Sequence, residues 1–169
     1  MPMKTLEDLF HDTLRDVYYA EKKLTKVLPK MAKNATNEEL AGAFKKHLAE
    51  TENHVSRLEE VFELIDKPAR AKKCEAMDGL AAEGDHVIEE GKDDAVLDAG
   101  LIASAQAVEH YEIARYGTLV AWAELMGNKK AAALLQKTLD EEKACDETLS
   151  GLAGGINETA NSPEEREAA

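Results

Sequence analysis

The chain has 169 residues and a formal net charge of −13, with only 10 Gly and 4 Pro in a composition dominated by Ala, Leu, Glu and Lys. This length is enough for one domain with a real core, and the scarcity of helix breakers predicts an all-α fold. The negative charge argues against nucleic acid and anionic membranes as partners, because both are bound by basic surfaces.

Two long amphipathic helices are predicted in the first part of the chain. The first begins at Thr5, which can form a capping box with Asp8, and carries apolar residues at spacings of three and four up to Asn34. The second begins with Thr36 as its cap and ends before Pro68. Because only a few residues separate these helices, they are expected to form an antiparallel hairpin.

A second helical hairpin is predicted after a longer connection. Residues 66–93 are expected to hold one shorter helix, weakened by its glycines. A third long helix then follows from Asp94 to Met126, Gly127 ends it, and Asn128 caps a fourth helix. Two hairpins joined by one long crossover are typical of the ferritin-like four-helix bundle.

The domain is predicted to span residues 1–153, with the helix-containing crossover between the second and third long helices of the bundle. Residues 154–169 are rich in Gly, Asn, Glu and Ser, so we expect a flexible C-terminal tail. Neither a signal-peptide pattern nor a run of 18 apolar residues is present, which predicts a cytoplasmic protein. The two cysteines, Cys74 and Cys145, form no motif and are expected to be free thiols.

Each long helix carries an acidic residue near its middle, on or beside its apolar face. The helix midpoints fall near residues 20, 51, 110 and 141, so antiparallel packing brings these acids to one level. A buried carboxylate without a partner is costly, and a cation is the simplest partner. The candidate metal ligands are Glu21, His47, Glu50, His54, Glu109, Glu112, Glu142 and Asp146.

The pattern departs from the usual dimetal site, in which two helices each give one Glu and two each give Glu-x-x-His. The second helix has Asn53 at the His position, with His54 one residue later and His47 a turn earlier. The fourth helix has Cys145 at that position, followed by Asp146, and the third has Glu-x-x-Glu. Whether His47, His54 or neither binds metal is left open, while hard oxygen ligands with imidazole favour two iron or manganese ions.

Five segments together resemble the YciF/YciE-like family of bacterial stress-associated proteins: Met3–Asp8, Tyr19–Lys22, His47–Thr51, Val108–Ala114 and Leu139–Lys143. The resemblance covers residues 1 to about 153 and implies a ferritin-like fold, a homodimer, a dimetal site and a role in the stress response. His54 does not belong to the family's motif. The positions that match it are Glu21, His47, Glu50, Glu109, Glu112 and Glu142.

Three functions fit this pattern. A redox enzyme would use the dimetal centre to react with oxygen or peroxide, since two metals about 3.5–4 Å apart can share a bridging oxidant. A metal-buffering or storage protein would bind the ions without turnover. A structural stress protein would use the metal only to hold the bundle together. The sequence assigns no catalytic residue and leaves turnover open.

Overall fold

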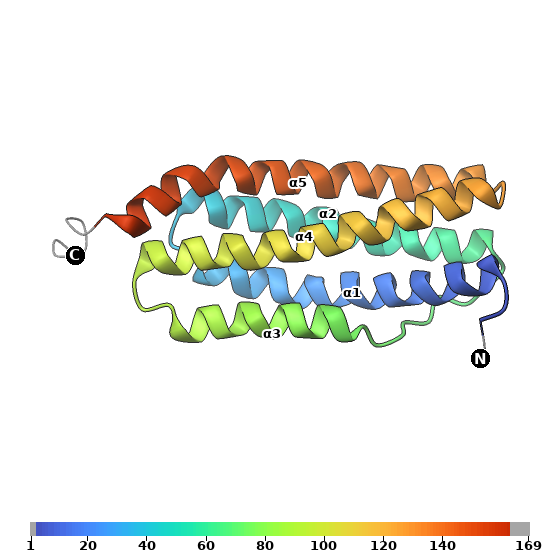
Figure 1. The fold of residues 1–169 in the computed structure, drawn as a ribbon, viewed down its shortest axis with the longest axis horizontal. Coiled ribbons are helices and arrows are strands. Elements are labelled where there is room, and N and C mark those ends of the chain that lie inside the picture. The colour runs from blue at the N-terminus through green and yellow to red at the C-terminus, as the bar shows by residue number, and fades with distance from the viewer. Residues whose placement is uncertain (1–2, 163–169) are drawn as a thin grey trace.

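The computed structural model describes residues 3–162, and within them every regular element is an α-helix (Figure 1). Four helices are long and the third is shorter, which confirms the predicted all-α, ferritin-like class. The helices are α1 (Leu6–Asn34), α2 (Glu38–Leu64), α3 (Glu75–Glu90), α4 (Asp94–Leu125) and α5 (Lys129–Asn161).

The long helices pack as two antiparallel hairpins, α1 with α2 and α4 with α5 (Figure 1). The crossover returns the chain along the bundle, so that α4 starts at the end where α1 meets α2. Helix α3 lies within this crossover and packs on the outside of α4 and α1. One long crossover between two hairpins is the ferritin-like connection.

Side-chain caps fix where the helices begin. The capping box of Thr5 and Asp8 is present at α1, and Asn128 caps α5 as predicted. Gly127 has a φ of 75°, which glycine adopts at little cost, and it makes the tight turn between α4 and α5. The predicted cap of α2 was wrong by one residue, because Asn37 rather than Thr36 accepts the backbone N–H of Leu40.

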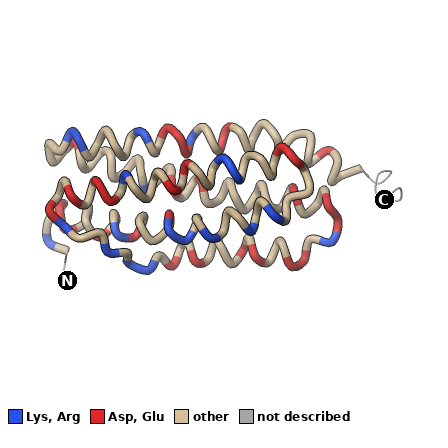
Figure 2. The backbone as a smooth tube through the Cα atoms, turned by 180° about the vertical axis from the view of Figure 1, so that it is seen from behind, with Lys and Arg blue, Asp and Glu red and all other residues tan. Residues whose placement is uncertain are grey.

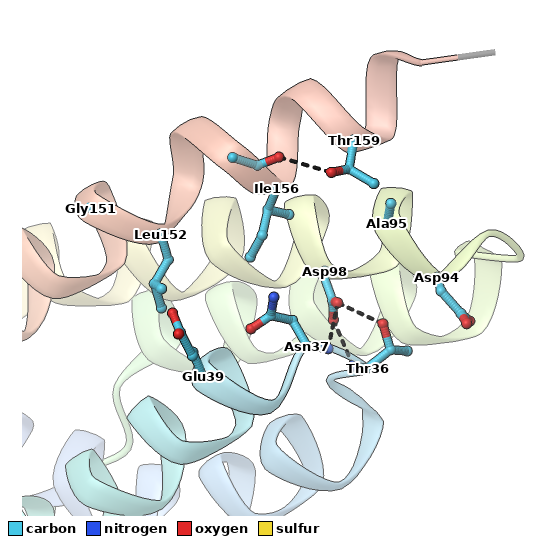
Figure 3. A pocket seen from close by; sticks show the side chains of 11 residues that line it. Thr36, Asn37, Glu39, Asp94, Ala95, Asp98, Gly151, Leu152, Ile156 and Thr159 are labelled. Carbon is cyan, nitrogen blue, oxygen red and sulfur yellow. Dashed lines mark hydrogen bonds between the residues drawn. The ribbon is translucent and has the colours of Figure 1, made fainter. Parts of the chain in front are cut away.

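Asp98 of α4 explains why Thr36 is not the cap. Its carboxylate is buried and accepts the backbone N–H groups of Thr36 and Asn37, both at 2.8 Å, and the Thr36 hydroxyl at 2.7 Å (Figure 3). These bonds tie the α1–α2 turn to the start of α4. The same residues line a cavity of about 450 Å³ beside the C-terminal part of α5.

The last helix is longer than predicted. Helix α5 continues to Asn161, whereas the sequence placed the start of a tail at residue 154. Ile156 supplies the reason, because its buried side chain packs into the apolar core and extends the buried face of α5. Residues 163–169, the remainder of the predicted tail, lie outside the described residues.

Two apolar clusters fill the bundle and leave a polar layer between them. The first cluster includes Phe10 and Leu14 of α1, and the second includes Leu24 and Leu28 further along the same helix. Buried Glu21 lies between these two pairs in the sequence. Every long helix contributes to both clusters, so its middle turn supplies the polar layer.

Charged residues are distributed along the helices in the described part of the chain, with both signs interspersed (Figure 2). The negative net charge is therefore not confined to one patch. Among residues 3–162, no helix combines the length and apolar character needed to cross a membrane.

We predict that Asp98→Asn lowers the free energy of unfolding by about 2 kcal/mol, because hydrogen bonds to a charged group contribute about 1.5–3 kcal/mol. Urea denaturation followed by circular dichroism measures the change. Asp94→Asn, at an exposed position in the first turn of the same helix, is the matched control and should change it by less than about 0.5 kcal/mol. Equal losses in both variants would contradict the tethering role of Asp98.

Candidate metal centre

A layer of ionisable side chains crosses the middle of the bundle without contact with solvent. Helices α1 and α5 each supply one glutamate, α4 supplies two, and α2 supplies two histidines. Each of the six side chains is at most 2% exposed. They are Glu21, His47, His54, Glu109, Glu112 and Glu142.

The first group in this layer joins α2, α4 and α5. Atoms of His47, Glu109, Glu112 and Glu142 lie within 4.8 Å of one another. Nε2 of His47 is 3.1 Å from Oε1 of Glu109 and 3.6 Å from Oε2 of Glu142. This spacing lets one ion contact donors from three helices.

The second group joins α1, α2 and α5. Atoms of Glu21, His54 and Glu142 also lie within 4.8 Å of one another. Nδ1 of His54 is 3.0 Å from Oε1 of Glu142 and 3.3 Å from Oε1 of Glu21. Glu142 belongs to both groups and offers one oxygen to each, which is the placement expected of a bridging carboxylate.

Most donor atoms of these two groups have no hydrogen-bond partner among the described residues. Several of them lie 3.0–3.6 Å from an atom of another side chain in the layer without forming a hydrogen bond. Buried polar atoms are normally satisfied, so such a set calls for an explanation such as an ion. The unpartnered atoms are Oε2 of Glu21, both ring nitrogens of His47, Nδ1 of His54, Oε2 of Glu109, and both carboxylate oxygens of Glu112 and of Glu142. These oxygen and nitrogen donors fit iron or manganese.

Without a cation, burial decides the protonation of the acids. Burial raises the pKa of Glu112 well above its usual value, and the nearby charges of Glu142, Glu21 and Glu109 raise it further. Burial also raises the pKa values of Glu21 and Glu142. The metal-free layer therefore holds protons that an ion would displace.

His54 is held in place by a second pair of side chains. Its Nε2 donates to Oε2 of Glu141 at 2.9 Å, and Arg57 donates to both oxygens of that carboxylate, at 2.5 and 3.0 Å. Burial alone would lower the pKa of His54, but the carboxylates of Glu142 and Glu21 outweigh it and raise the pKa to about 10. Such outer partners fix the orientation of a ligating imidazole.

Tyr116 was missed as a site residue, because the sequence placed it in the core. Its fully buried hydroxyl donates to Oε1 of Glu21 at 2.5 Å. The helical spacing could have identified Tyr116 as a site residue, since it follows Glu112 by four residues and Glu109 by seven on one helix face. Tyr116 therefore holds the Glu21 oxygen that also lies 3.3 Å from Nδ1 of His54, while Oε2 of Glu21 has no hydrogen-bond partner among the described residues.

Glu50 and Asp146 lie outside both groups. The Glu50 side chain is 24% exposed, pairs with Lys46 at 3.3 Å, and lies 3.7 Å from Nδ1 of His47. Glu50 lies three residues after His47 and four before His54 on the same side of α2, but it sits closer to solvent than either histidine. Asp146 instead accepts a hydrogen bond from Gln106 at 3.0 Å. Their role as metal ligands stays a prediction.

Both cysteines are free and buried. Cys74 lies 3.0 Å from the hydroxyl of Tyr111 and accepts the backbone N–H of Met77. Cys145 instead borders the polar layer, where its sulfur lies within 4.8 Å of donor atoms of His47 and Glu109. Burial raises the pKa of the Cys145 thiol to about 11, although the adjacent imidazole of His47 lowers it.

Comparison with known proteins gives close relatives over nearly the whole chain. The family described as a domain of unknown function (DUF892) matches residues 5–161. Protein YciF of Escherichia coli (strain K12) is 49% identical over 162 residues, which are 95% of this chain and 98% of YciF.

Solved structures extend the similarity to three dimensions. The crystal structure of the E. coli stress protein YciF matches with a TM-score of 0.88 and 48% identity, over 95% of this chain and 100% of that one. YcfI of Rhodopseudomonas palustris, for which a structural role has been suggested, matches with a TM-score of 0.85 and 48% identity, over 87% of this chain and 94% of that one. A protein of Xanthomonas campestris pv. campestris is 22% identical with a TM-score of 0.74, over 98% of this chain and 100% of that one. This similarity supports the fold alone.

We predict that the metal-free protein loses stability as the pH rises from 6.5 toward about 10. The folded state raises the pKa of His54, so its stabilisation is full below the unfolded pKa of 6.5 and lost as the pH approaches about 10. Acids whose pKa is raised act in the same direction. Urea denaturation across this range should show a loss of up to about 5 kcal/mol, since each unit of pKa difference corresponds to about 1.4 kcal/mol.

His54→Gln should make this pH dependence shallower, whereas His86→Gln, at an exposed position on α3, should leave it unchanged. A metal-free protein whose stability is constant or rises over the same range would contradict the assigned environment of His54.

Proposed function

The chain belongs to the DUF892 family and resembles YciF within it. We propose that it is a stress-associated protein whose bundle binds a carboxylate-bridged pair of metal ions. These ions would serve redox chemistry with oxygen or peroxide. The observation that carries this proposal is the pair of adjacent donor groups that share Glu142. The stress role rests on the name of the related E. coli protein.

The two groups differ in composition, and each suits one ion. His47, Glu109 and Glu112 would hold the first ion, Glu21 and His54 the second, and Glu142 would bridge them. Iron and manganese bind carboxylate oxygen and imidazole nitrogen, and both change oxidation state. When bound, such a pair supplies the electrons for reduction of oxygen or peroxide.

The residues of the chain contribute orientation and exclusion of water. Tyr116 holds Glu21, and Glu141 with Arg57 holds His54, so one donor of each residue stays directed into the layer. The apolar clusters on either side keep the layer dry. In such surroundings electrostatic interactions are stronger than in water, which favours tight binding of cations. No residue is assigned as catalytic.

A metal-stabilised structural or metal-buffering protein is the second candidate. It is favoured by the burial of the layer, because each of the six side chains is at most 2% exposed. Cavities of about 450–570 Å³ occur on the described surface, but they are lined by residues outside the layer. An oxidant would therefore need a local opening of the bundle to reach bound metal.

We also propose that the protein is a homodimer. Helix α4 packs against α1, α3 and α5 within the single chain. Val96 and Leu125 of α4 nevertheless stay 42% and 77% exposed in the single chain. A second copy of the chain is the proposed cover for this face.

We predict about two iron or manganese ions per chain in protein reconstituted with both metals. Glu142→Gln should reduce this content clearly, because the substitution removes the shared carboxylate from both groups. Glu147→Gln, at an exposed position of the same helix, is the matched control and should retain the full content. Elemental analysis after removal of loosely bound metal measures it, and a parent protein without bound metal would overturn the proposal.

Turnover separates the two candidate functions. If the redox function holds, the metal-loaded parent consumes hydrogen peroxide, and Glu112→Gln lowers the rate by at least about tenfold because it removes a donor of the first group. An oxygen electrode follows oxygen release, and a dye assay follows peroxide loss. Circular dichroism should show that the variant keeps its helical fold. A parent that binds metal and gains thermal stability, yet consumes no peroxide or oxygen, would support the structural candidate instead.

A further inference from the structure

Cys145 forms a separate set with His47 and Glu109, two members of the first group, and neither the family resemblance nor the proposed carboxylate site accounts for it. It follows Glu142 by three residues on α5, so the two side chains lie on neighbouring positions of one helix face. Its side chain is only 9% exposed. Sulfur, an imidazole nitrogen of His47 and a carboxylate oxygen of Glu109 all lie within 4.8 Å of one another.

His47 and Glu109, the neighbours of Cys145, carry donor atoms that form no hydrogen bond among the described residues. Both ring nitrogens of His47 and Oε2 of Glu109 have no hydrogen-bond partner among the described residues, and both side chains are at most 2% exposed. An unsatisfied imidazole and carboxylate beside a thiol form a set of three different donor types. Zinc, iron and cobalt are bound by such mixed sets.

Cys74 has different surroundings from those of Cys145. Cys74 caps α3 by accepting the backbone N–H of Met77, and its sulfur lies beside the hydroxyl of Tyr111, which in turn donates to Asp16. Those contacts explain Cys74 as a structural residue. Cys145 caps no helix, and its surroundings are the unsatisfied donors of the polar layer.

We propose that Cys145 is a sulfur ligand of the ion held by His47 and Glu109, and that this position prefers zinc, cobalt or ferrous iron to manganese. The proposal rests on the proposed metal-binding function and names which of its two positions is selective. Thiolate ligands favour the softer ions, whereas carboxylates alone favour manganese or magnesium. Binding displaces the thiol proton, which leaves to solvent as the metal–sulfur bond forms.

The second position differs because sulfur is absent from its set. Glu21, His54 and Glu142 offer only oxygen and nitrogen. The two positions therefore differ in preference, because only the first can add sulfur to its oxygen and nitrogen donors. This difference accounts for a cysteine where the usual dimetal pattern has histidine.

Cobalt(II) tests the sulfur ligand directly, because thiolate bound to cobalt gives a charge-transfer band in the near ultraviolet that carboxylate and imidazole do not give. The full-length, metal-free protein is titrated with cobalt under anaerobic conditions. We expect the band in the parent and in Cys74→Ser, the matched control, and its loss in Cys145→Ser. Circular dichroism and thermal melting check that each variant stays folded.

Competitive titration with a chelator tests the preference. Cys145→Ser should weaken zinc binding by more than about 10-fold, the lower end of what loss of an outer partner alone costs, while manganese binding changes less. If cobalt binds to the parent without the band, or if the band persists in Cys145→Ser, the sulfur ligand is refuted while the metal centre stands. If cobalt does not bind the parent at all, both the ligand and the proposed function fail.

Discussion

Burial of four carboxylates and two imidazoles in one dry layer is the constraint on which the rest of this structure depends. An unpaired charge in a protein interior costs several kcal/mol even after relaxation, and a domain of this kind has only about 5–15 kcal/mol of net stability. The layer must therefore be neutralised by protons or by cations. The raised pKa values of the acids favour neutralisation by protons, and the position of Glu142 in both donor groups suits neutralisation by cations.

The surrounding structure serves to keep this layer at one height. Caps at α1 and α5 fix the helix starts, and Asp98 ties the α1–α2 turn to α4. The ion pair of Arg57 with Glu141 reaches from α2 to α5 at the level of His54. Apolar clusters above and below exclude water from the layer, so its electrostatic interactions act at low dielectric.

The family relationship leaves the function to be decided by the site. YciF is named as a stress protein, while a structural role has been suggested for YcfI, and both share nearly half of their residues with this chain. A fold of this kind hosts many activities. The arrangement of donors therefore carries more weight than the family, and the deep burial of these donors limits the access of an oxidant to them.

Helical periodicity, turn residues and caps were enough to obtain the helices, the crossover and the ferritin-like class from sequence, because those signals act over a few residues. The repeated acids at helix midpoints also pointed to a common layer. Local spacing does not determine how deeply each side chain lies, and the structure places the predicted ligands Glu50 and Asp146 at the margin of the layer.

Only the tertiary structure placed His47 and His54 in separate groups, joined Tyr116 to Glu21 and brought Cys145 beside His47. Rotation of each helix about its axis and the register between hairpins decide these contacts. Both depend on how whole helices pack against each other, which local spacing does not encode. The same reason explains the end of α5, where burial of Ile156 against the core outweighs the two glycines that precede it.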